Sequence, residues 1–455
     1  MKTAQQKISL LLIITLLGLF PVFPSAKVGV GDAVAEPALQ TQTAQGADMP
    51  GDAVIADSHL AVSYLTLAPG SNEQRLNFSW HTKAKAEERK PLVRIWKQGG
   101  EAMEFAGESS ENPLRISGMY YHRVTVTGLE ADTSYAYQLG NGNGEWSLVY
   151  TTKTGNPSSF SFLVCGDPQV IDSVSGAAWA ATVTAALARF PDVSFMMGTG
   201  DQVENPEKKC FDAFFMPEEL SALPFATCVG NHEYAPGSYH AAHYMFNPPN
   251  WQTKPAADYW YRYGDALFMV TNCSTGMNTR AVRAHGAFIE QAIAQNPDAK
   301  WRILTFHYDV YGQGQSHSRR SGKDYRNLYV PIIDQYGIDA VFNGHDHSYS
   351  RSKQMMFSGN PNNSGSVGMQ ETVFDADGMA LNPTGTVYFT LNSASGRKPY
   401  GLAPLKEYTA FMNQNRQKNI TVVHMTADTF RCVTYEVSVD GELTEIDSYG
   451  IRKTR

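Results

Sequence analysis

The sequence predicts an α/β domain preceded by an all-β sandwich. Short stretches of alternating apolar and polar residues fill positions 58 to 153, whereas apolar runs alternate with helix-like segments from about 160 onward. At 455 residues the chain is also long for one average domain, so two domains are expected. Its net charge of -7 argues against a nucleic-acid partner, because binding to the phosphate backbone needs a basic face.

The first residues have the features of a signal peptide. Lysines precede a single apolar run, Ile8–Phe20, which is short for a membrane span. Cleavage is expected after Ala26 or Ala35, and an uncleaved anchor is the alternative. We therefore assign residues 1–35 to the signal peptide and its cleavage region and 36–57 to a spacer. The mature protein is expected to be secreted or extracytoplasmic, at the cell surface or in a periplasm, without stable membrane insertion.

Residues 58–155 are assigned to the all-β domain. Four of its runs alternate apolar and polar residues, as half-buried strands do, at Leu76, Phe78 and Trp80, Val93 and Ile95, Val124 and Val126, and Tyr135, Tyr137 and Leu139. The stretch YYHRVTVTGLEADTSYAYQLG resembles a strand pair of fibronectin type III-like modules. The polar hinge TKTGNPSS ends this domain, and residues 156–455 form the second one.

The second domain alternates apolar runs, typical of buried strands, with helix-like segments. The segments AAWAATVTAALARF and AVRAHGAFIEQAIAQ are helix-like, and the apolar runs between such segments predict a sheet covered by helices. Three of the five cysteines, Cys165, Cys228 and Cys273, fall inside these runs, where a buried thiol is the expected state. The fold is therefore not expected to depend on disulfides.

Five apolar runs of this domain end in residues that can bind a metal ion. These endings are Asp167 with Gln169, Asp201, Asn231 with His232, His307, and His345 with His347. Ligand sites in such sheets gather at strand ends, where loops converge, and carboxylate, amide and imidazole groups together suit Mn, Fe or Zn. If the chain stays extended through VFNGHDHSYSR, its two histidines lie on the same face, because side chains alternate along a strand.

In the order D-x-Q, GD, GNH, H and GHxH, these blocks resemble the calcineurin-like metallophosphoesterases. With the fibronectin-like domain in front, the chain resembles the purple acid phosphatase branch. The resemblance implies an α/β fold, a four-layer β-sandwich flanked by helices, with two metal ions per chain (Fe, Mn or Zn). It further implies an exported phosphatase that hydrolyses small-molecule phosphate monoesters by attack of a metal-activated hydroxide. A phosphodiesterase or nucleotide hydrolase with the same site is the alternative, and a surface binding protein with a silent phosphatase fold is the third hypothesis.

The resemblance also implies a role for each residue. Six side chains would hold the two ions, with Asp201 bridging them, Asp167 and His347 on the first, and Asn231, His307 and His345 on the second. His232 would contact the substrate phosphate and stabilise the transition state or protonate the leaving oxygen. His317, which lies ten residues after His307, is a further candidate for phosphate contact or acid–base catalysis.

Two positions depart from the purple enzymes. Those enzymes carry a tyrosine ligand three residues after the bridging aspartate, in GDxxY, whereas this chain has Glu204 there. Without a phenolate ligand the purple colour should be absent, and Glu204 is expected either to bind metal or to face solvent. Other metallophosphoesterases have a metal-binding His or Gln two residues after the first aspartate. Gln169 occupies that position and is expected to replace the tyrosine as a ligand of the first metal through its amide oxygen.

Overall fold

A computed structural model describes most of the chain after its N-terminal region. The described residues are 59–83, 90–111, 119–234, 245–252, 257–275, 278–315, 317, 321–358 and 368–454. The expected signal peptide and spacer, residues 1–57, lie outside them. Among the described residues, no helix has the length and apolar character needed to cross a membrane.

The N-terminal part is a sandwich of two antiparallel sheets. The first has the strand order β1 (Ser63–Pro69), β2 (Arg75–Thr82), β6 (Tyr120–Thr127) and β5 (Glu108–Glu111). The second has the order β4 (Met103–Ala106), β3 (Leu92–Lys97), β7 (Ser134–Gly140) and β8 (Tyr150–Lys153). Their facing side chains form one core, in which the rings of Phe78 and Tyr137 meet edge to face at 5.0 Å. The four predicted runs are confirmed as β2, β3, β6 and β7.

Strand β2 is buried on both faces, although its alternating pattern predicts one exposed face. Its second face carries Asn77, Ser79 and His81, all of them buried. The Asn77 side chain donates to the carbonyl of Asn247 at 2.8 Å, and the Asn247 amide donates to the carbonyl of Phe78 at 3.1 Å. Polar residues on this face therefore hydrogen-bond a later segment of the chain, because hydrogen bonds offset the cost of burying them.

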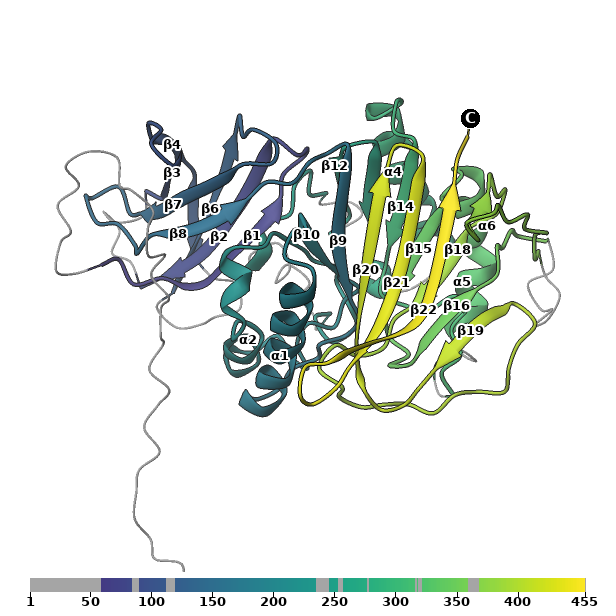
Figure 1. The fold of residues 1–455 in the computed structure, drawn as a ribbon. Coiled ribbons are helices and arrows are strands. Elements are labelled where there is room, and N and C mark those ends of the chain that lie inside the picture. The colour runs from purple at the N-terminus through teal and green to yellow at the C-terminus, as the bar shows by residue number, and fades with distance from the viewer. Residues whose placement is uncertain are drawn as a thin grey trace, which may run out of the picture. The chain divides into compact units, whose positions relative to one another are not determined.

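Two seven-stranded mixed sheets follow. The first has the order β11 (Phe225–Ala226), β10 (Phe195–Gly198), β9 (Ser159–Cys165), β20 (Lys418–Thr426), β21 (Thr429–Val437), β22 (Leu443–Arg452) and β17 (Ala380–Leu381). The second has the order β12 (Tyr259–Tyr263), β13 (Ala266–Val270), β14 (Trp301–Thr305), β15 (Ala340–Asn343), β18 (Val387–Thr390), β16 (Tyr349–Ser352) and β19 (Thr409–Asn413). Figure 1 shows the C-terminal strands β20, β21 and β22, in yellow, next to β9, which comes from the start of this domain.

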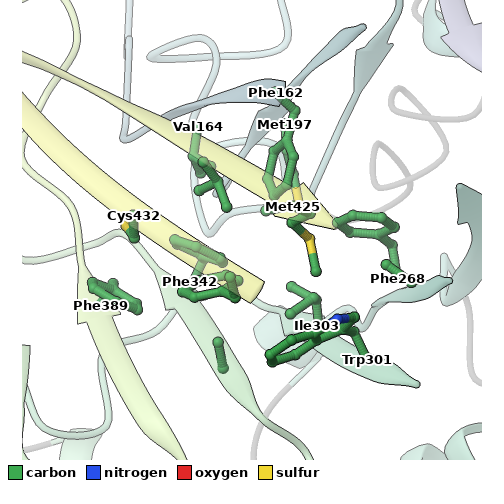
Figure 2. Close-up of a cluster of buried hydrophobic side chains, with 14 of the residues drawn as sticks. Phe162, Val164, Met197, Phe268, Trp301, Ile303, Phe342, Phe389, Met425 and Cys432 are labelled. Atoms are coloured by element: carbon green, nitrogen blue, oxygen red, sulfur yellow. The ribbon is translucent and has the colours of Figure 1, made fainter. Parts of the chain in front are cut away.

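The two sheets pack face to face around an aromatic core. Figure 2 shows Phe162 of β9 and Met197 of β10 together with Phe268, Ile303 and other residues of the opposite sheet. Strands β10, β13 and β15 are buried on both faces, so their runs read as continuously apolar rather than alternating. This packing confirms the expected β-sandwich.

Helices cover the outer faces of both sheets. The first sheet is covered by α1 (Ser173–Arg189) and α2 (Lys208–Phe214), and the second by α4 (Thr279–Gln295), α5 (Ser321–Leu328) and α6 (Val330–Gln335). Two short 3₁₀ helices, η2 (Glu218–Ser221) and η3 (Cys273–Thr275), are also present. Asp172 begins α1, since its side chain accepts the backbone N–H of Ser175 at 2.9 Å, an N-cap that satisfies an otherwise unpaired donor. The α/β fold with helices flanking a β-sandwich is thus confirmed.

One predicted strand is much shorter than its apolar run. The run Phe225 to Val229 forms only the two-residue β11. The backbone carbonyl groups that follow β11 are hydrogen-bonded by side chains and not by a neighbouring strand. The Gln202 amide donates to the carbonyl of Cys228 at 2.9 Å, and the Tyr259 hydroxyl donates to the carbonyl of Thr227. All five cysteines lie in the described part of the chain, and each is buried and unpaired.

Candidate metal centre

The predicted ligands lie in loops that follow parallel strands of both sheets. Asp167, Asp201 and Asn231 follow β9, β10 and β11 of the first sheet, while His307 and His345 follow β14 and β15 of the second. Parallel strands end at the same edge of a sheet, so these loops meet there. The backbone N–H of His345 donates to Oδ2 of Asp167 at 2.7 Å and joins the two groups of loops.

Three potential ligand atoms converge on Nε2 of His307. Its Nε2 lies 3.1 Å from Oδ2 of Asp201, 3.0 Å from Oδ1 of Asn231 and 3.2 Å from Nδ1 of His345. On the other side of the ring, Nδ1 donates to the carbonyl of Thr199 at 3.1 Å, because a carbonyl can only accept. In the neutral ring Nε2 therefore carries a lone pair, which faces the carboxylate oxygen of Asp201 and the amide oxygen of Asn231, and neither oxygen can donate. Such an arrangement calls for a cation, and a carbonyl on the opposite nitrogen is typical of metal-binding histidine.

The charges in this cluster favour a cation as well. Burial lowers the pKa of His307, but the charges of Asp201 and Asp167 outweigh it and raise this pKa to about 10. Burial alone would raise the pKa of Asp201, yet the charge and hydrogen bond of His307 hold that pKa below its ordinary value. Burial and the charge on His307 lower the pKa of His345 to about 2. The buried carboxylates favour a positive charge between Asp201, His307 and His345. A metal ion bound there would supply that charge in place of the proton on His307.

A second group of ligand atoms surrounds Asp167. Nε2 of His347 lies 3.2 Å from Oδ2 of Asp167, and Nδ1 of His347 donates to the carbonyl of Arg397 at 2.8 Å. Among the described residues, Oδ1 of Asp167 and Oε1 of Gln169 are buried without a hydrogen-bond partner. Buried oxygen atoms of this kind are costly unless a cation or water binds them. The residues present therefore fit a pair of metal ions.

Glycines leave room for these carboxylates. A Cβ on Gly344 would lie 2.0 Å from Oδ1 of Asp167, and one on Gly230 would lie 2.0 Å from Oδ1 of Asp201. No side chain fits at such a distance, so the close approach of backbone and ligand requires glycine at both positions.

The chain does not stay extended through His345 and His347, so the condition under which they would share one face is not met. Strand β15 ends at Asn343, and the two histidines have φ angles of 70° and 42°. Left-handed backbone at two positions destroys the alternation of a strand. His345 instead faces His307, while His347 faces Asp167.

His232 and His317 lie at the rim of the cluster and share one hydrogen-bonding pattern. Nδ1 of His232 donates to the carbonyl of Glu204 at 2.7 Å, and Nδ1 of His317 donates to the carbonyl of His345 at 3.0 Å. The His317 ring stacks on the His345 ring with centroids 4.2 Å apart. Both side chains are partly exposed, at 26% and 30%. The carbonyl contacts fix the orientation of both rings at the partly exposed side of the cluster.

The Glu204 carboxylate forms ion pairs with two basic side chains and does not simply face solvent. Its Oε2 lies 3.2 Å from Nη1 of Arg397 and 2.7 Å from Nζ of Lys398. Of the two expectations for Glu204, exposure to solvent is therefore wrong, because its side chain is only 17% exposed and is paired with basic groups, while metal binding stays a prediction.

Sequence reasoning assigned no role to Glu233 or Ser393. The buried Glu233 carboxylate accepts the backbone N–H groups of Asp201 and Gly230, both at 2.9 Å, and so ties together the loops after β10 and β11. The Ser393 hydroxyl donates to the carbonyl of Asp167 at 2.8 Å. Glu233 directly follows the GNH block, which was a usable signal, whereas Ser393 belongs to no recognisable pattern.

Comparisons with known proteins agree with this architecture. Two family models match, the purple acid phosphatase N-terminal domain over residues 62–154 and the calcineurin-like phosphoesterase over residues 160–349. Purple acid phosphatase 1 of Ipomoea batatas is 25% identical over 69% of this chain and 70% of its own length. Fe(3+)-Zn(2+) purple acid phosphatase 12 of Arabidopsis thaliana is 23% identical over 61% of this chain and 62% of its own length. The solved structure of purple acid phosphatase PPD1 from yellow lupin (Lupinus luteus) has a TM-score of 0.67 at 17% identity, covers 87% of this chain and 75% of its own, and shows the same fold.

Proposed function

The chain belongs to the calcineurin-like phosphoesterases, in the purple acid phosphatase-like branch, and we propose that it is an exported phosphatase that hydrolyses phosphate monoesters. Members of this family are metal-dependent phosphoric ester hydrolases with a binuclear metal centre. The observation that carries the proposal is the set of potential metal ligands around Nε2 of His307, because carboxylate, amide and imidazole groups together suit a catalytic metal ion.

Seven side chains would hold the two ions. We assign Asp201 to both ions, Asp167, Gln169 and His347 to the first, and Asn231, His307 and His345 to the second. This mixture of carboxylate, amide and imidazole suits Fe, Mn or Zn, and the Arabidopsis relative is named for Fe(3+) and Zn(2+). When bound, the ions would supply Lewis acidity and a water molecule activated near neutral pH.

The chain's own acid–base groups would be His232 and His317. Because Nδ1 of each ring donates to a carbonyl, the proton of the imidazolium form that can be transferred is the one on Nε2. We assign His232 to protonation of the leaving oxygen, since its backbone N–H also donates to Oδ1 of Asp201 at 2.9 Å and fixes it beside the bridging ligand. His317 would hold a phosphate oxygen from the side of His345.

Replacement of Asp201 tests the function directly. The variant Asp201→Ala, assayed with Mn on an aryl phosphate monoester, is expected to lose at least about 100-fold in kcat/KM, because both ions lose a ligand. Asp192→Ala is a matched control, since that carboxylate is 82% exposed and pairs with Lys153 outside the cluster. Undiminished turnover by Asp201→Ala would reject the mechanism. A bis-aryl diester assayed in parallel separates monoesterase from diesterase activity, and faster diester cleavage would reject the monoester assignment.

The export proposal rests on the apolar run near the N-terminus. Expression of the full chain in a cell with a secretion pathway, followed by mass spectrometry of the intact product, is expected to show a mature N-terminus after Ala26 or Ala35. A product that keeps Met1 and stays inside the cell would contradict export.

A further inference from the structure

We propose that Arg397 and Glu204 form a positioning ion pair that orders the first metal site and His232. This inference rests on the proposed assignment of Asp167, Gln169 and His347 to the first ion. Neither residue of the pair is a proposed ligand, and Arg397 lies in an irregular segment after β18, far along the chain from every ligand block.

Arg397 binds two of the proposed first-site ligands. Its Nη1 donates to the carbonyl of Gln169 at 2.5 Å and to Oε2 of Glu204 at 3.2 Å. Its own carbonyl accepts Nδ1–H of His347 at 2.8 Å. One residue thus fixes the backbone that carries Gln169 and the ring orientation of His347.

Gln169 needs such support because its backbone is strained. Its φ of 41° is unfavourable for a residue with a Cβ, and only neighbouring contacts can maintain it. The N–H of Gln169 donates to the carbonyl of Asp201 at 2.7 Å, and Arg397 holds the carbonyl on the other side. Loss of the guanidinium would free that carbonyl, and the buried Oε1 of Gln169 would leave its place beside Asp167.

Glu204 connects the same pair to His232. Its carbonyl accepts Nδ1–H of His232 at 2.7 Å, while its carboxylate is anchored by Arg397. The pair therefore contacts residues from the loops after β9, β11 and β15. His307, the central residue of the other site, is oriented by the carbonyl of Thr199 instead. The inference therefore predicts a loss confined to the first metal site.

Lys398 provides a matched control for charge. Its Nζ lies 2.7 Å from the same Glu204 carboxylate, so Lys398→Ala removes the same charge from the same partner. Unlike Arg397, its side chain makes no hydrogen bond to Gln169 among the described residues. A difference between the two variants therefore reports positioning and not net charge.

The test is calorimetric titration of Mn(II) into the metal-free mature protein. Wild type is expected to bind two ions. Arg397→Ala is expected to bind one of them about 10- to 100-fold more weakly, as removal of outer-shell partners typically does, and the other within about 3-fold of wild type. Lys398→Ala should stay within about 3-fold at both sites. Glu204→Gln should share the direction of Arg397→Ala with a smaller effect, because it keeps the carbonyl contact to His232 and a neutral acceptor for Arg397.

Several results would overturn the inference. These are wild-type affinity in Arg397→Ala, equal losses in Arg397→Ala and Lys398→Ala, or an equal loss at both metal sites. Circular dichroism and thermal unfolding of the metal-free variants check the fold, and Arg397→Lys replaces Arg397→Ala if the alanine variant is unfolded. A wild-type protein that binds two ions but hydrolyses no phosphate ester would reject the proposed function, while the titration alone would still decide on the ion pair.

Discussion

Nε2 of His307 lies 3.1 Å from Oδ2 of Asp201, and both side chains are buried. His307 follows β14 of one sheet and Asp201 follows β10 of the other, so this contact joins the two sheets at their shared edge. The site depends on how closely the backbones of the two sheets approach each other there. Changes that add volume at this edge should therefore affect function before they affect the rest of the fold.

Gly344→Ala tests this dependence. The added Cβ would lie 2.0 Å from Oδ1 of Asp167 and would push His345 away from His307. We expect a loss of about 1–3 kcal/mol in the free energy of unfolding, as overpacking typically causes, and loss of most Mn binding. Gly286→Ala on helix α4 is the control, because its Cβ would lie 3.4 Å from the nearest atom of Ile332 on helix α6, an ordinary contact, and this variant should keep full Mn binding. Denaturant unfolding and metal titration measure both effects, and normal Mn affinity in Gly344→Ala would contradict the argument.

The convergence of the candidate ligands could be predicted from the sequence, because it depends on residue type. Carboxylates and imidazoles after apolar runs are visible in the sequence, and the structure brings Asp201, Asn231, His307 and His345 together. Contacts made through backbone carbonyls carry no such signal, because any residue can supply them. The carbonyl of Thr199, which orients His307, is one example.

The backbone conformation of the ligand loops and the burial of polar strand faces could not be predicted from the sequence either. His345 has a left-handed backbone, and its N–H donates to Asp167, a residue far away in the chain, so neither feature can be read from the local sequence. The periodicity of β2 correctly marks Phe78 as a core residue, but periodicity cannot reveal that Asn247 covers the polar face of the strand.

His232→Ala should affect substrates according to their leaving group. If its Nε2–H protonates the leaving oxygen, an alkyl phosphate should lose about 10²- to 10⁴-fold in kcat. A 4-nitrophenyl phosphate, whose leaving group needs no proton, should lose about 10-fold less than that. His59→Ala, at an exposed position, serves as the control and should match wild type. Equal losses on both substrates would assign His232 to phosphate binding alone.

The iron-loaded protein should lack the visible absorption band of the purple enzymes. Glu204 stands where those enzymes have tyrosine, and its carboxylate is bound by Arg397 and Lys398. Tyr400 is the candidate for a substitute phenolate ligand, because its ring centroid lies 5.1 Å from that of His347. Absorption spectroscopy after loading with ferric iron measures the band. A band that Tyr400→Phe abolishes would show that a phenolate from another loop had replaced the missing ligand.

The stability of the protein should fall in mild acid because of His81. This ring is fully buried, and neither of its nitrogen atoms has a hydrogen-bond partner among the described residues. Burial, helped by the charge of His122, lowers its pKa to about 3. Between that value and the unfolded pKa of about 6.5, only the unfolded chain binds the proton. The contribution of the neutral His81 to the free energy of unfolding is therefore fully present above pH 6.5 and is lost as the pH falls below it.

The contribution of His81 should reach about 1.4 kcal/mol per pH unit below 6.5. His81→Phe keeps the edge-to-face contact with Tyr64, whose ring lies 5.3 Å away, but removes the titrating group. Denaturant unfolding at several pH values between 4 and 7 is expected to show a shallower decline for this variant than for wild type. His59→Asn, at an exposed position, should follow the wild-type curve. Parallel curves for wild type and His81→Phe would mean that His81 accepts its proton in the folded state, and that the buried ring is not the source of acid sensitivity.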